Sequence, residues 1–217
     1  MNNHQLKTMN LFFTSNKIKI CLLCIAISVL TNCKNASIDY KYSSESDMFQ
    51  CEIANQDLFK EALYAFENYI ETYYIASPPS TLSQGYAFYW EIAIRDQMPA
   101  LELFDDHLIK LVEALKNINE LWLPIQDGYT LNHNHEIMRC IANDIKDSNA
   151  SKELLNLLNT NSYQPNLFMS AIGSQANNLI DDKALATYFA LNKFYAKVID
   201  IDFNTIKKKT EYSNLND

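Results

Sequence analysis

Glycine and proline are scarce in this 217-residue chain, which contains three glycines and five prolines. Three glycines are too few for a glycine-rich phosphate loop or a dinucleotide-binding fingerprint. A sheet protein with many tight turns is also disfavoured, because glycine supplies the positive φ angles that such turns need. The composition therefore argues against the common nucleotide-binding folds and against an all-β architecture.

Basic residues are also few, with 18 lysines and arginines against 26 acidic residues and a formal net charge of −8. A general nucleic-acid binder would need a basic face, so no nucleic-acid partner is expected. Apolar and aromatic residues make up 48% of the chain, which is enough for a packed core. The length is typical of one domain.

Recognisable catalytic motifs are missing as well. The sequence has no G-x-S-x-G, no P-loop and no C-x-x-C-H, and we expect no cofactor. His135-Glu136 begins like a zinc-protease motif, but Arg139 stands where the second histidine would be needed. The sequence therefore favours a non-enzymatic protein.

The first 30 residues have the proportions of an export signal. Lys7, Lys17 and Lys19 precede an apolar run over 20–30, and no acidic residue lies among them. As a helix, that run would rise about 16 Å, roughly half of the hydrocarbon core of a bilayer. These features are typical of a secretory signal peptide, whose translation starts at Met1 or Met9.

The end of this segment, Leu30-Thr31-Asn32-Cys33, resembles a bacterial lipobox. The resemblance covers residues 1–33 and implies that 1–32 are removed and that Cys33 carries the lipid anchor. Asn32 stands where lipoproteins usually have Gly, Ala or Ser. In this family an Asp after the cysteine can retain the protein at the inner membrane; Lys34 stands there instead, which favours the outer membrane. The rest of the chain, here called the body, resembles no family.

Two cysteines remain in the expected mature chain, Cys51 and Cys140, because Cys21 and Cys24 lie in the signal segment. In an oxidising compartment they could form a disulfide. The alternative is a pair of separate buried thiols.

We predict an all-α domain over 53–204, an irregular bundle of about six or seven helices. A flexible tether over 33–52 precedes it, and a polar tail over 205–217 follows it. The segment 86–97 fits either a strand or a helix, and its helical neighbours favour a helix. The predicted helices cover 55–75, 86–97, about 99–122, 134–146, 150–159, 165–179 and a last stretch that starts at Asp181 or Asp182.

Three groups of residues are candidates for binding. Arg95 and Arg139 are the only arginines, and each either forms a structural ion pair, with Glu91 or Glu136, or lines an anion pocket. His133, His135 and Cys140 could bind a metal, although a polar loop leading into an amphipathic helix explains them as well. Tyrosines form the third group and suit either a binding face or the core: Tyr64, Tyr69, Tyr73, Tyr74, Tyr86 and Tyr89.

Three functions remain open. The first is a membrane-anchored envelope lipoprotein that binds an envelope protein through an acidic, tyrosine-rich face. The second is a small-ligand or metal-binding envelope protein. The third is an envelope hydrolase with a non-standard site. The third predicts a cleft with His107 or His133 beside a carboxylate. The neighbouring residues Asp105, Asp106 and His107 cannot form such a site by themselves, because adjacent helical residues point in different directions.

Overall fold

The computed structural model describes residues 38–74, 81–164, 167–169, 179–203 and 205. Packing divides the chain after Ser37, and all described residues belong to the second unit. The predicted signal peptide (1–32), Cys33, and the candidate start Met9 therefore lie outside the described residues. The same is true of most of the predicted helix over 165–179 and of the predicted tail apart from Thr205.

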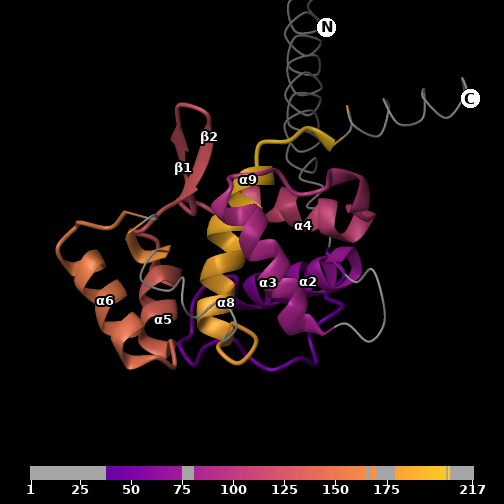
Figure 1. Ribbon diagram of the computed structural model, residues 1–217. Coiled ribbons are helices and arrows are strands. Elements are labelled where there is room, and N and C mark those ends of the chain that lie inside the picture. The colour runs from indigo at the N-terminus through magenta and orange to yellow at the C-terminus, as the bar shows by residue number, and fades with distance from the viewer. Residues whose placement is uncertain (1–37, 75–80, 165–166, 170–178, 204, 206–217) are drawn as a thin grey trace, which may run out of the picture. The chain divides into compact units, whose positions relative to one another are not determined.

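The described residues are mainly helical, as the sequence predicts, with one small two-stranded antiparallel sheet (Figure 1). The elements are α2 (Gln56–Tyr74), α3 (Leu82–Ile94), the 3₁₀ turn η1 (Leu101–Leu103), α4 (Asp106–Lys116), β1 (Trp122–Ile125), β2 (Gly128–Leu131), α5 (Glu136–Asp144), α6 (Ser148–Asn159), α8 (Lys183–Phe189), η3 (Ala190–Tyr195) and α9 (Ala196–Val198).

Side-chain caps fix where most of these helices begin. A capping side chain accepts a hydrogen bond from a main-chain N–H that has no partner inside the first turn. Thr81 and Gln84 form a reciprocal capping box at the start of α3. The other caps are Asp105 on α4, His135 on α5, Asp147 on α6 and Asp182 on α8.

The core forms where α2 and α3 meet the helical run of α8 and η3. Phe66 of α2 is fully buried. Its ring lies 5.2 Å from the rings of Tyr89 and Phe194 and 5.9 Å from that of Tyr86, measured between centroids. Such edge-to-face and tilted contacts add to the burial of the rings. The apolar stripe predicted for 55–75 is therefore the inner face of α2.

The segment 86–97, which fitted either a strand or a helix, is helical over most of its length in α3. Gly85 lets α3 approach α2 closely, because a Cβ at that position would meet the carbonyl oxygen of Ile70 at 3.1 Å.

The last helical run contains a π-helical segment, η3, that the sequence analysis did not foresee. A π turn disrupts the regular i→i−4 ladder. The main-chain carbonyl of Lys193, within η3, accepts a hydrogen bond from the hydroxyl of Tyr89 at 3.1 Å. Asn192 is buried and its amide donates to the hydroxyl of Tyr188 at 3.3 Å.

The hairpin of β1 and β2 adds two strands to the predicted all-α fold, which is otherwise mainly helical, and it corrects the prediction of one helix over about 99–122. The structure has η1, then α4 from Asp106 to Lys116, and then the hairpin. Gly128, with φ of +131°, follows a two-residue turn and pairs with Ile125. Asp127-Gly128 between apolar runs is a hairpin signal, and Pro124 cannot continue a helix. The hairpin projects from the helices in Figure 1.

Candidate functional site

The segment 38–51, here called the strap, is fastened to one side of α2. Two main-chain N–H groups, those of Lys41 and Tyr42, donate to the carboxylate of Glu61 at 2.8 and 3.0 Å. The ammonium of Lys60 contacts the carboxylate of Asp47 at 3.0 Å. The strap is therefore bound through charged groups of α2 that are themselves buried.

This packing corrects the expected flexible tether over 33–52. Met48 and Phe49 are only 4% and 3% exposed and belong to the core. The apolar side chains of the strap, together with hydrogen bonds from its backbone to α2, outweigh the tendency of its polar residues to remain solvated. The body thus begins at Ile38 instead of residue 53, and only 33–37 of the expected tether lie outside the described residues.

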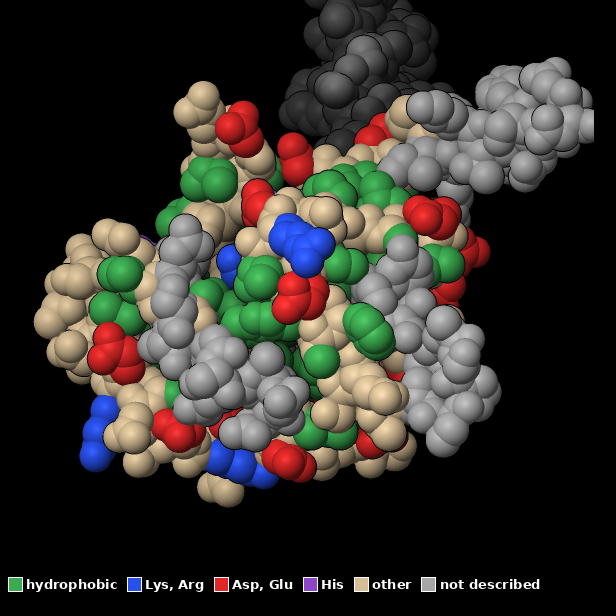
Figure 2. All heavy atoms as spheres, viewed as in Figure 1, with side chains coloured by type: hydrophobic (Ala, Val, Ile, Leu, Met, Phe, Trp, Pro, Cys, Tyr) green, Lys and Arg blue, Asp and Glu red, His purple; other side chains and the backbone are tan. Residues whose placement is uncertain are grey.

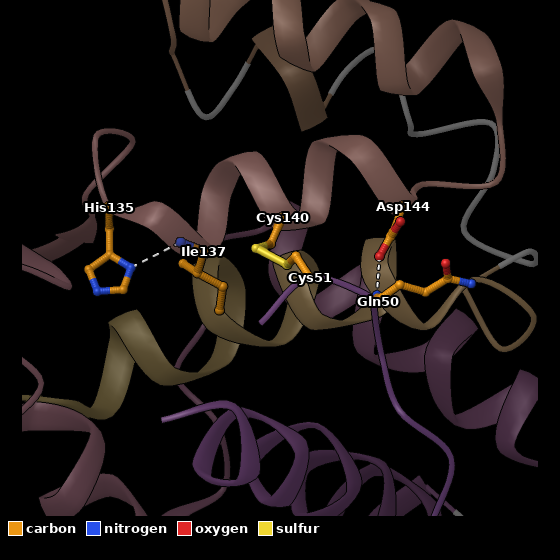
Figure 3. Close-up of a disulfide and its surroundings, with 6 residues drawn as sticks. All are labelled: Gln50, Cys51, His135, Ile137, Cys140 and Asp144. Atoms are coloured by element: carbon orange, nitrogen blue, oxygen red, sulfur yellow. Dashed lines mark hydrogen bonds between the residues drawn. A yellow bond between two sulfur atoms is a disulfide. The ribbon is translucent and has the colours of Figure 1, made fainter. Parts of the chain in front are cut away.

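A disulfide joins the end of the strap to α5. Cys51 and Cys140 are bonded, with their Cα atoms 5.8 Å apart and a sequence separation of 89 residues. One residue earlier, the N–H of Gln50 donates to the carboxylate of Asp144, at the end of the same helix (Figure 3). Of the two alternatives left open by the sequence, the structure contains the disulfide.

Glu61 also contacts His107, the second residue of α4. Nε2 of His107 lies 2.7 Å from a carboxylate oxygen of Glu61, and the two side chains are 9% and 1% exposed. Burial and the negative charges of Glu61, Asp105 and Glu45 raise the pKa of the neighbouring Tyr42. A buried carboxylate thus holds an imidazole where the strap, α2 and α4 meet.

A cavity of about 180 Å³ opens beside this pair. His107 and Asp105 line it from the start of α4, Tyr42 lines it from the strap, and Asn68 and Thr72 line it from α2. Asp105 caps α4 through the N–H of Leu108 at 2.7 Å, and its carboxylate also lies 3.5 Å from the ammonium of Lys41. The third function hypothesis predicts a cleft with His107 beside a carboxylate, and this is such an arrangement.

Sequence reasoning did not single out Glu61. A usable signal existed, because Glu61 lies three residues after Leu58 and four before Ala65, on the apolar side of α2. A carboxylate at a core position needs partners, and here they come from the strap and from α4, which no local pattern reveals.

The two arginines do not form a shared pocket. Arg95, after the end of α3, is exposed and lies 3.4 Å from the carboxylate of Glu91, one of its expected partners. Arg139 on α5 is exposed and donates to the side-chain oxygen of Asn159 at 2.9 Å. Each arginine therefore has its own separate partner.

The metal candidates have other roles. Cys140 is in the disulfide, and Nδ1 of His135 accepts the N–H of Ile137 at 3.2 Å as the cap of α5. Burial lowers the pKa of His135, although Glu136 and Glu120 act in the opposite direction. His133 contacts Asn161 at 3.1 Å. Within the described ranges, no three His, Cys, Asp or Glu side chains are grouped so that they could hold a metal ion.

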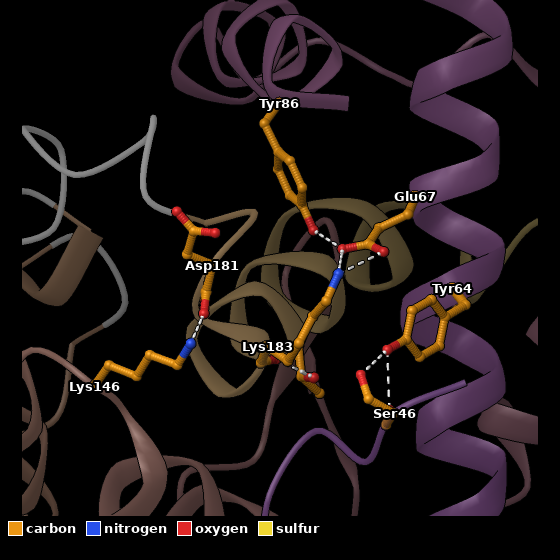
Figure 4. Close-up of polar contacts among 8 residues, drawn as sticks. Ser46, Tyr64, Glu67, Tyr86, Lys146, Asp181 and Lys183 are labelled. Atoms are coloured by element: carbon orange, nitrogen blue, oxygen red, sulfur yellow. Dashed lines mark hydrogen bonds and ion pairs between the residues drawn. The ribbon is translucent and has the colours of Figure 1, made fainter. Parts of the chain in front are cut away.

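Of the two alternatives left open for the tyrosines, a binding face or the core, the described ones are in the core. Tyr64 and Tyr69 are 8% and 4% exposed, and Tyr86 and Tyr89 are fully buried. The hydroxyl of Tyr86 donates to Glu67 at 2.7 Å (Figure 4). Burial, together with the charge of Glu67, raises the pKa of Tyr86 well above its ordinary value. Of the remaining two, Tyr73 and Tyr74, no side-chain placement is described.

The buried carboxylate of Glu67 also forms an ion pair with a lysine of α8. The ammonium of Lys183 lies 2.7 and 2.9 Å from the two carboxylate oxygens of Glu67. Figure 4 shows Glu67, Tyr86 and Lys183 pointing toward one another from three different helices. This group ties α2, α3 and α8 together.

The outer face of the hairpin carries exposed aliphatic side chains. Leu123 and Ile125 alternate with Trp122 and Pro124, so they share one face of β1, and they are 38% and 55% exposed. On the other face, the indole N–H of Trp122 donates to the carbonyl of Leu115 at 2.8 Å. The hairpin is therefore held to α4 on one side and presents apolar surface on the other.

A groove continues from the hairpin along the ends of α4 and α9. Two adjoining cavities of about 390 and 240 Å³ share Lys116 and Ile199 in their walls. Acidic residues predominate among their charged residues: Glu113, Glu120, Asp200 and Asp202, against Lys116. Lys116 lies 3.3 Å from Asp200. Figure 2 likewise shows acidic side chains scattered over the viewed face, with apolar ones exposed between them.

Comparisons with protein-family models, with curated proteins and with solved structures find no match for this chain. None of the helices in the described part of the chain combines the length and apolarity that crossing a membrane requires.

Proposed function

We propose that this protein is a bacterial envelope lipoprotein, anchored through lipid on Cys33, whose helical body binds a protein partner. The main structural support for a location in the cell envelope is the disulfide between Cys51 and Cys140. Disulfides persist in oxidising compartments and are rare in the cytosol. The bond therefore supports the export that the lipobox-like sequence at 30–33 implies.

The packed strap limits how far the anchor can lie from the body. Five peptide steps separate Cys33 from Ile38, and a fully extended chain of that length spans at most about 18 Å. The net charge of −8 includes Lys7, Lys17 and Lys19, so removal of the signal peptide leaves a still more acidic protein. An anionic membrane surface repels such a protein, and the lipid holds it close. Lys34 favours the outer membrane.

The partner-binding surface we propose is the hairpin with its adjoining groove. Exposed Leu123 and Ile125 offer an apolar contact on one face of the hairpin, and Glu113, Glu120 and Asp200 make the adjoining groove, on the side of Trp122, negatively charged. A complementary partner presents apolar side chains flanked by lysine or arginine. Pro124 has no N–H to offer to an added strand, so binding occurs through side chains and not by extension of the sheet.

The anchor is tested by the intact mass of the protein from the membrane fraction, compared with a Cys33→Ser variant. We expect a chain that begins at Cys33 and carries acyl groups, and we expect the variant to lose both the processing and the acyl mass. An unmodified full-length wild-type chain would rule out the lipoprotein.

The partner is tested by photo-crosslinking in intact cells with a photoreactive residue at Ile125. Asn156, exposed on α6, is the matched control position. We expect a discrete crosslinked product at Ile125, which mass spectrometry then identifies, and none at Asn156. A pattern that is the same at both positions would exclude the hairpin as a specific binding surface.

An envelope hydrolase is the second candidate, favoured by the contact between His107 and Glu61 beside a cavity. A carboxylate that orients an imidazole is the arrangement of a general base. Turnover of cell-wall or ester substrates that is lost in His107→Gln, while the variant still folds, would support it. Equal rates in both proteins would exclude it.

A further inference from the structure

The cavity beside His107 has a polar lining that includes Asn68, Thr72, Asp105 and His107. Glu61 already fastens the strap by accepting two main-chain N–H groups, and His107 adds a second ionisable group at 9% exposure. Buried ionic pairs contribute little stability compared with apolar residues of the same size. An ionisable pair at the wall of a cavity is therefore a candidate for ligand binding.

The volume restricts the ligand to one ring. An apolar cavity of about 150 Å³ accommodates benzene, whereas drug-sized ligands occupy roughly 300–1,000 Å³. At about 180 Å³, this cavity holds one substituted six-membered ring. Nucleotides and folded peptide segments are too large for it.

The lining determines the chemistry of that ring. Asn68 and Thr72 each offer both a donor and an acceptor, Asp105 offers acceptors, and His107 offers a ring nitrogen. Tyr42 and Tyr69 add aromatic surface, and the hydroxyl of Tyr69 is already bonded to the backbone of Ala100. The two ionisable side chains of the lining, Asp105 and His107, already contact Lys41 and Glu61, so an uncharged ligand fits better than an ion.

We propose that this cavity binds a single neutral sugar ring, either a free monosaccharide or the terminal residue of a glycan. Alternating donors and acceptors match the hydroxyl groups of a pyranose, and the tyrosines match its apolar face. Asn68 and Thr72 lie four residues apart on α2, so their side chains bind adjacent hydroxyls from one side. The proposal does not depend on the anchor or on the protein partner.

The test is saturation-transfer NMR on the full chain in detergent, with glucose, galactose, N-acetylglucosamine and β-linked N-acetylglucosamine disaccharide as probes. A ligand of this size binds with a Kd of roughly 1 mM. We expect transfer to at least one probe. Transfer to both N-acetylglucosamine probes indicates that a free sugar suffices, whereas transfer to the disaccharide alone indicates a glycan end.

Variants show whether a bound sugar occupies this cavity. We expect Asn68→Ala and Thr72→Val each to weaken binding by about tenfold, because each removes one hydrogen-bonding partner. Both residues are exposed, so neither change threatens the fold. The matched control is Asn156→Ala, an exposed asparagine on α6, which leaves the affinity unchanged. His107→Gln, checked for folding by thermal melting, also weakens binding.

Two results would overturn the proposal. The first is no saturation transfer to any probe at roughly 10 mM, about tenfold above the expected Kd. The second is transfer that Asn68→Ala and Thr72→Val leave unchanged, because the sugar would then bind elsewhere. Neither result bears on the crosslinks of the hairpin or on the mass of the anchored protein, so the two proposals can fail separately.

Discussion

Removal of the disulfide by a double Cys51→Ser, Cys140→Ser substitution tests how far the covalent link stabilises the body. The 89-residue separation between the cysteines sets the size of the loop that the bond closes in the unfolded chain. The loop-closure relation gives about 4.6 kcal/mol at 25 °C for such a loop. In the folded state, the strap keeps its hydrogen bonds to Glu61 and Lys60, so the loss arises mainly in the unfolded state.

The assays are urea unfolding and thermal melting of the full chain in detergent. We expect the double variant to lose about 4–5 kcal/mol of unfolding free energy and about 9–18 °C in Tm. We also expect its m-value to rise, because an unfolded chain without the cross-link exposes more surface. Wild-type protein under reducing conditions is the control and matches the variant. A loss below about 1 kcal/mol, or an unchanged m-value, would refute the loop-entropy explanation.

Three further predictions concern ionisable groups that are buried or partly buried. His135 has a pKa below the ordinary 6.5, and its neutral Nδ1 caps α5, so the unfolding free energy falls as the pH drops below about 6.5. Urea midpoints measured at several pH values show this loss. The His135→Asn variant, which keeps a capping side chain, does not show it. Burial raises the pKa of Tyr163 to about 12, so the unfolding free energy declines as the pH rises from about 10 to 12. In a pH titration followed by tyrosinate absorbance, the Tyr163→Phe variant has one fewer tyrosine that ionises above the ordinary pKa. A titration curve identical to that of the wild type contradicts the raised pKa of Tyr163. Lys183→Met leaves the carboxylate of Glu67 buried at 7% exposure without its cationic partner and lowers the unfolding free energy by about 1–3 kcal/mol. The Glu67→Leu, Lys183→Met double variant recovers most of this free energy. Strictly additive effects of the two substitutions would show that the pair is not coupled.

Helices with a clear apolar period were predictable from the sequence. α2, α5 and α6 fall within or close to the predicted ranges 55–75, 134–146 and 150–159, because each buries one periodic face. The predicted helix over about 99–122 was wrong because the apolar residues keep helical spacing across the positions where the helix is interrupted. Asp105 caps a new helix there, and the chain after Lys116 turns into a hairpin.

The strap shows why the same reasoning failed before residue 53. Its sequence is polar and has no helical period, so local propensity predicts a flexible tether. What holds it is distant in sequence: Glu61 and Lys60 on α2, and Cys140 on α5. Long-range partners leave no trace in a short window of sequence. For the same reason, the contact between Glu61 and His107 could not be foreseen.

The sequence by itself determined the mainly helical class and the acidic charge, because each depends on composition or on residues a few positions apart. It also supplied the hypothesis of a lipid anchor at Cys33. Tertiary structure alone decided that Cys51 meets Cys140, that the described tyrosines are in the core, and that a histidine and a buried glutamate meet beside a cavity. These outcomes depend on how helices pack against one another, and packing brings together residues that no local pattern connects.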